Sequence, residues 1–156
     1  KVKKVYIDDI IASIFMILTI LIVTLNIGMR YFFNSPIRSA EEIATICFIW
    51  SVFIGGASCY RKKMHMGIDI LTQMLPNKIS KYIEFLVNII VVIMNAAFFY
   101  LSFKFSINSR LKPTAVLGIS SIYVNFSLVI GFGLIFIYSI FESVKSYKKL
   151  KIKRWI

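Results

Sequence analysis

The sequence contains little of what an enzyme active site needs. Its one histidine, His65, lies in a basic segment with no constellation of catalytic partners nearby. Its two cysteines, Cys47 and Cys59, fall twelve residues apart in one apolar run and would face different directions on a straight helix. A disulfide-oxidising membrane enzyme would need cysteine pairs in its outer loops, and this sequence has none there. We therefore predict a protein that is not an enzyme and has no catalytic residue, cofactor or metal ion.

Acidic residues are also scarce. Seven Asp and Glu stand against 19 Lys and Arg, which gives a formal charge of +12 over 156 residues. The cations gather at the two ends and in one middle segment, rather than among aromatic residues on polar elements. This distribution argues against a nucleic-acid partner and favours a protein whose charges set its orientation in a phospholipid membrane.

Charge is missing altogether from four long apolar runs, at residues 10–29, 43–60, 85–103 and 122–141. About 20 apolar residues in a helix cross the hydrocarbon core of a bilayer, and backbone amides in lipid must be paired. Hydrophobic residues make up 58% of the chain, more than one soluble core of this size could bury. The sequence thus predicts an all-α, polytopic membrane protein, with four transmembrane helices in a single domain over residues 1–156.

Lys and Arg are divided unequally between the two sides of such a membrane. The N-terminus, the middle segment and the C-terminus share one side and carry 14 of them, whereas the other side carries five. Cytoplasmic segments are rich in Lys and Arg, so both termini are predicted to be cytoplasmic. The five outer cations are Arg30, Arg38, Lys104, Arg110 and Lys112.

The middle segment between the second and third spans also has a helical pattern. Apolar residues recur at Met64, Ile68, Leu71 and Leu75, and Pro76 ends the pattern. Twelve residues are too few to cross a bilayer. We therefore expect an amphipathic helix over residues 64–75 that lies in the inner membrane interface.

Ionisable residues are absent from the middle of every span. Such residues usually mark a proton path or an ion site, so this chain is not expected to carry a coupled solute by itself. Asp8 and Asp9 lie at the cytoplasmic edge of the first span, where we expect water to reach them. A stand-alone four-helix exporter or channel is the alternative function, and Asn88 and Asn95 on one face of the third span are the polar residues that favour it.

Small residues recur at intervals of four in two spans, which allows helices to approach closely. They are Ser51, Gly55 and Cys59 in the second span, and Ser127 and Gly131 in the fourth. Trp50 lies near the middle of its span, away from the interfaces where tryptophan is enriched, and this suggests contact with another helix of this chain or of a partner. We expect Trp50, Ser51 and Gly55 to pack against a partner.

An ordered set of residues runs from Asn26 to Asp69. The set consists of Asn26, Arg30, Tyr31, Phe33, Asn34, Ser35 and Pro36, then Glu41 and Glu42, then Trp50, Phe53 and Gly55, then Arg61, His65 and Asp69. With the order of the spans, this set resembles the small membrane subunit (Q subunit) of TRAP transporters, the tripartite ATP-independent periplasmic family. One difference is Ser39, where the resemblance leads us to expect a tryptophan two residues before the acidic pair. A docking role that depends on an aromatic side chain there is not supported.

The resemblance implies a division of labour in a bacterial inner membrane. A large membrane transport subunit would hold the substrate and sodium sites, and a periplasmic substrate-binding protein would capture a carboxylate such as a C4-dicarboxylate or sialic acid. The small subunit would bind neither substrate nor sodium. It would pack beside the large subunit and extend the rigid frame in the bilayer.

A periplasmic partner would meet the two outer segments of this chain. Between them they carry five positive charges and the two negative charges of Glu41 and Glu42, which makes a basic rim. The glutamates could instead stabilise the N-terminus of the second helix or pair with Arg30 or Arg38. We expect docking through Arg38, Glu41, Glu42, Arg110 and Lys112.

Overall fold

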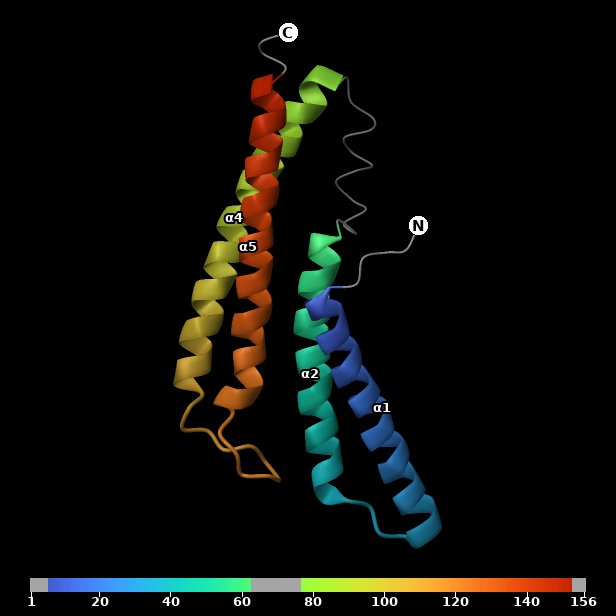
Figure 1. Cartoon of the computed structure of the whole chain (residues 1–156). Helices are drawn as coiled ribbons and strands as arrows, with labels where there is room; N and C mark the ends of the chain where they lie inside the picture. Colours follow the sequence, from blue (N-terminus) through green and yellow to red (C-terminus); the bar gives the residue numbers. More distant parts are fainter. Residues whose placement is uncertain (1–5, 63–76, 153–156) are drawn as a thin grey trace.

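The computed structural model describes residues 6–62 and 77–152 of the chain (Figure 1). These residues form four helices, α1 (Ile7–Phe33), α2 (Arg38–Arg61), α4 (Asn77–Asn108) and α5 (Ile122–Ile152). Each helix contains one predicted span and continues past it, and each is long and apolar enough to cross a membrane. The all-α, four-span prediction is confirmed. The amphipathic helix predicted for residues 64–75 lies outside the described residues.

The described helices form a row instead of a closed bundle (Figure 1). Helix α1 packs on α2, α2 packs on α5, and α5 packs on α4, and no other pair of these helices is in contact. Burial is greater inside the row than at its ends. Of the most apolar stretch of α2, 33% is buried, whereas only 6% is buried in the corresponding stretch of α1 or of α4. The seam between α2 and α5 therefore joins two helical hairpins, and the flanking helices leave broad apolar faces for lipid or for a partner.

Two asparagines shape the turn between α1 and α2. Asn34 ends α1 in the left-handed conformation, with φ of 49°, and asparagine tolerates this conformation better than most residues. The Asn26 side-chain oxygen accepts a hydrogen bond from the backbone N–H of Ile37, at 2.9 Å. This bond ties the residue before α2 back to α1. It therefore helps to set the distance between the end of α1 and the start of α2.

Helices α2 and α5 approach each other closely at Gly131. A Cβ atom added there would lie 2.8 Å from the Cβ of Phe53 and 3.0 Å from its carbonyl oxygen. Ser127, one turn earlier, is fully buried, and its hydroxyl donates to the backbone of its own helix at Val124. The small residues predicted at intervals of four in the fourth span therefore allow the backbones of α2 and α5 to approach closely.

Polar side chains also join α4 to α5. The Asn88 side-chain amide donates to the Ser146 hydroxyl across the two helices, at 2.9 Å. The Asn95 amide instead donates to the carbonyl of Val91 in its own helix. Both asparagines thus take part in packing within the chain, which removes the feature that favoured a stand-alone exporter or channel.

Candidate functional site

The loop between α4 and α5 is a short hairpin at one end of the molecule. Thr114 N–H donates to the carbonyl of Ile119 at 2.8 Å, and Ser121 N–H donates to that of Lys112 at 2.9 Å. Gly118 adopts a φ of 65°, a conformation that glycine reaches without a steric penalty. The hairpin lies at the same end of the molecule as the turn between α1 and α2 (Figure 1).

The tip of this hairpin is bound to α2 by Glu42. The Oε2 atom of Glu42 accepts hydrogen bonds from the backbone N–H groups of Val116, at 2.7 Å, and Leu117, at 3.1 Å. These contacts connect residues 74 and 75 positions apart in the chain. Glu42, grouped by sequence with the docking residues, therefore has a partner within the chain.

The other rim residues are open to solvent. Arg38, Glu41, Arg110 and Lys112 are all exposed, and so is Arg30. In residues 6–62 and 77–152, no ion pair links Arg30 or Arg38 to Glu41 or Glu42, so the pairing considered for these glutamates is not formed. The structure places the basic residues at the end of the molecule that holds the α1–α2 turn and the α4–α5 hairpin, with their side chains exposed.

The residues expected to pack against a partner contact α1 of this chain. The Trp50 ring stacks on Phe15 with the ring centroids 5.8 Å apart. The Ser51 hydroxyl donates to the carbonyl of Ala12 at 2.8 Å, and a Cβ atom at Gly55 would lie 3.6 Å from the Cβ of Ala12. This small-residue face is thus used to pair α2 with α1.

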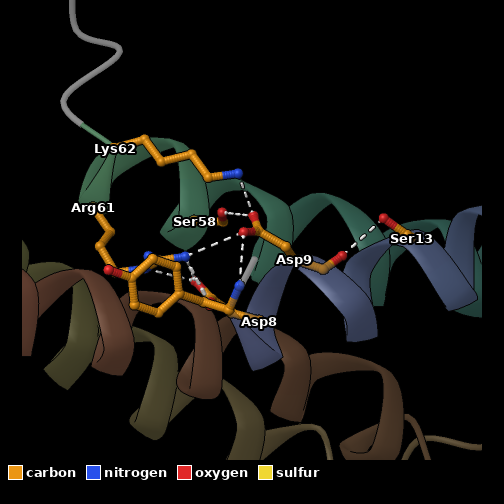
Figure 2. A network of polar contacts seen from close by, with 7 residues as sticks. Asp8, Asp9, Ser13, Ser58, Arg61 and Lys62 are labelled. Carbon is orange, nitrogen blue, oxygen red and sulfur yellow. Dashed lines mark hydrogen bonds and ion pairs between the residues drawn. The ribbon is translucent and has the colours of Figure 1, made fainter. Parts of the chain in front are cut away.

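A charged cluster lies at the opposite end of the same helix pair (Figure 2). The Arg61 guanidinium meets the Asp8 carboxylate through two nitrogens, Nε at 3.1 Å from Oδ2 and Nη2 at 2.9 Å from Oδ1. The Asp9 carboxylate accepts from Ser58 and pairs with Lys62. The prediction that water reaches both aspartates was wrong for Asp8, whose side chain is only 10% exposed because Arg61 covers it.

This cluster also reaches α5. The guanidinium carbon of Arg61 lies 3.5 Å from the centre of the Tyr6 ring and 5.9 Å from that of Tyr138 in α5. A guanidinium over aromatic faces in partly buried surroundings is attracted to them. This cluster was not predicted from the sequence, although two aspartates before the first span and an arginine after the second lie at the same end if those spans form an antiparallel hairpin.

The residues that carried the family resemblance have separate structural roles. Asn26 and Asn34 shape the turn between α1 and α2, and Arg61 holds the cluster with Asp8. Tyr31 is 78% exposed near the C-terminal end of α1, where an aromatic side chain suits the membrane interface. His65 and Asp69 lie outside the described residues. No group of three His, Cys, Asp or Glu side chains within the described residues is arranged to hold a metal ion.

Comparison with known proteins points to one family. The model of the DctQ component of tripartite ATP-independent periplasmic (TRAP) transporters matches residues 19–148. A protein of Haemophilus influenzae named among the TRAP transporter small permease proteins is 28% identical over 152 residues, which cover 96% of this chain and 92% of that protein. The sialic acid TRAP transporter small permease protein SiaQ of Vibrio cholerae is 26% identical over 144 residues, covering 92% of this chain and 83% of that protein.

A third similarity is to part of a larger protein. The sialic acid TRAP transporter permease protein SiaT of Haemophilus influenzae is 30% identical to this chain over 89 residues. These residues are 57% of this chain but only 14% of SiaT. A segment similar to this chain therefore forms a small part of a much longer permease.

Proposed function

Since the chain belongs to the DctQ family of TRAP transporter components, we propose that it scaffolds a large permease and helps a periplasmic substrate-binding protein to dock. The family match over residues 19–148 is the observation that carries this proposal. The chain is a multi-pass inner-membrane protein of a transporter, and such a subunit has no catalytic step of its own. The system is proposed to take up a carboxylate, such as a C4-dicarboxylate or sialic acid, by coupling to sodium.

Association with a large permease is supported by the shape of the fold and by SiaT. The row of four described helices leaves both flanking helices with little burial, as suits a protein that widens a membrane assembly. In SiaT, a segment similar to this chain is joined to the rest of a permease in one polypeptide. Two segments that work as one chain in one organism are good candidates for a stable complex in another.

Docking of the binding protein is proposed to use the exposed cations of the rim. Arg38, Arg110 and Lys112 lie in the outer segments and make no ion pair with a described residue. Complementary charge at the edge of an interface raises the rate of encounter more than it raises the final affinity. An acidic surface on the binding protein would therefore meet this rim. The termini are proposed to be cytoplasmic, in agreement with the 14 Lys and Arg on that side.

A charge-reversal experiment tests this docking. Arg110→Glu with Lys112→Glu should lower uptake when the binding protein is limiting, while co-purification with the large permease stays unchanged. Lys145→Glu with Lys149→Glu, the same charge change at the opposite end of α5, serves as the matched control and should leave that dependence unaltered. Equal uptake by the rim variant and the wild type at every concentration of binding protein would reject the docking role and leave a membrane scaffold.

A further inference from the structure

We propose that Glu42 is a positioning residue that holds the tip of the α4–α5 hairpin over α2 and so places the basic residues of that hairpin for docking. The holding contact is a property of this chain alone. Its consequence for docking rests on the proposed function. The two parts can therefore be tested separately.

The geometry favours a strong and directed contact. One carboxylate oxygen receives two consecutive backbone N–H groups, of Val116 at 2.7 Å and of Leu117 at 3.1 Å. Successive N–H groups in a turn form a small concave site that suits an anion, and hydrogen bonds to an ionised acceptor are stronger than those between neutral groups. Glu42 thus supplies from α2 the anion that these two amides can bind.

The hairpin needs this contact because its own bonds leave the tip unsecured. Its backbone bonds join Thr114 to Ile119 and Lys112 to Ser121, and among the described residues none of them uses the amides of Val116 or Leu117. The hairpin therefore sets its own shape, whereas Glu42 sets where it sits relative to α2.

The basic residues are fixed to the same hairpin. The carbonyl of Lys112 accepts from the amide of Ser121, and the carbonyl of Arg110 accepts from the hydroxyl of Ser120 at 2.6 Å. If Glu42 locates the tip, it also locates the backbone from which Arg110 and Lys112 extend. The adjacent Glu41 is exposed and has the same charge, which makes it a matched control.

Hydrogen–deuterium exchange on the full chain in lipid nanodiscs tests the holding contact. Glu42→Ala should speed exchange at the amides of Val116 and Leu117 by roughly tenfold or more, because each loses a hydrogen bond to a charged group. The amides of Thr114 and Ser121, which bond within the hairpin, should change much less. Glu42→Gln, which keeps an acceptor oxygen but loses the charge, should give an intermediate rate. This variant provides the test if Glu42→Ala destabilises the whole chain. The proposal is wrong if exchange at the two tip amides is unchanged, or if Glu41→Ala raises it equally.

Transport in proteoliposomes tests the consequence for docking. Both Glu42→Ala and Glu42→Gln make the rim more positive by one charge, so electrostatics alone predicts the same lower half-saturating concentration of binding protein for each. A positioning role predicts the opposite for Glu42→Ala, which should raise that concentration about two- to tenfold, the size expected when loose side chains must be ordered on binding. Glu42→Gln, which keeps an acceptor oxygen for the tip amides, should raise it less. The maximal rate should be unchanged. Faster tip exchange without a higher half-saturating concentration would refute positioning, whereas failure of the Arg110 and Lys112 reversal would refute docking itself.

Discussion

The close approach at Gly131 leads to a quantitative prediction about the seam between the two helical hairpins. Gly131→Ala places a Cβ atom 2.8 Å from the Cβ of Phe53 and 3.0 Å from its carbonyl oxygen, whereas carbon atoms normally approach to 3.5–4.0 Å. The obstacle includes the α2 backbone, so the seam must open by several tenths of an ångström. Overpacking of this kind costs about 1–3 kcal/mol. Since α2 and α5 form the contact between the hairpins in the described residues, this cost falls on the whole fold.

Three other glycines provide controls. Substitution of each by alanine adds the same methyl group and stabilises the helix by a similar amount, about 1 kcal/mol. An added Cβ at Gly56 meets nothing within 4 Å, and at Gly55 it makes an ordinary contact at 3.6 Å. At Gly133 it meets the movable ring edge of Phe99 at 3.1 Å. Stability should therefore fall in the order Gly56→Ala, Gly55→Ala, Gly133→Ala and Gly131→Ala, with the first and last about 1–3 kcal/mol apart.

Unfolding of the chain in mixed micelles by added SDS, followed by circular dichroism and tryptophan fluorescence, measures this order. The difference between Gly131→Ala and Gly56→Ala removes the shared effect of helix propensity. The steric reasoning is refuted if these two variants unfold at the same SDS fraction, since the seam would then not be as close as the structure shows. Gly131→Leu should be worse than Gly131→Ala if the obstacle is the Phe53 backbone.

Three further predictions concern the two ends of the molecule. Arg61→Ala should destabilise the chain in the same SDS titration, and adding Asp8→Ala should restore part of the loss, because an unpaired buried carboxylate is worse than no charge; a double variant less stable than the single Arg61→Ala variant would contradict the ion pair. Asn26→Ala should cost about 1 kcal/mol by removing the bond to the start of α2, while Asn26→Asp keeps the acceptor and should cost less, so equal losses would argue against that bond. In a background without native cysteines, a cysteine at Lys3 should resist an impermeant thiol reagent added to intact cells and one at Lys112 should react; the reverse pattern would overturn the proposed orientation.

The spans could be predicted from sequence because charged residues end each apolar run, and because lipid demands a helix of known length. The partners of the small-residue faces could not. Gly131 and Gly55 have similar neighbours in sequence, yet one faces α2 and the other faces α1. Spacing shows that a face allows close approach, but it does not show which helix arrives there. The open row was unpredictable for a related reason, since lipid and another helix both accept an apolar side chain.

Of the polar contacts, too, one could be inferred from the sequence and another could not. Asp8 and Arg61 are 53 residues apart, and each alone resembles an ordinary charge at the edge of a span. Their meeting follows once the first two spans are treated as an antiparallel hairpin. The contact of Glu42 could not be inferred even then, because its partners are the backbone amides of Val116 and Leu117, and backbone groups leave no signature in a side-chain pattern.

Uptake by reconstituted proteoliposomes, with one component omitted at a time, tests the central claim most directly. Vesicles would contain this chain and the large permease of its own transport system, with the binding protein and labelled carboxylate outside and a sodium gradient. We expect uptake only when all three proteins are present, and none from vesicles that hold this chain alone. Full uptake by the large permease and binding protein without this chain, or transport by this chain on its own, would contradict its assignment as a required, non-transporting subunit.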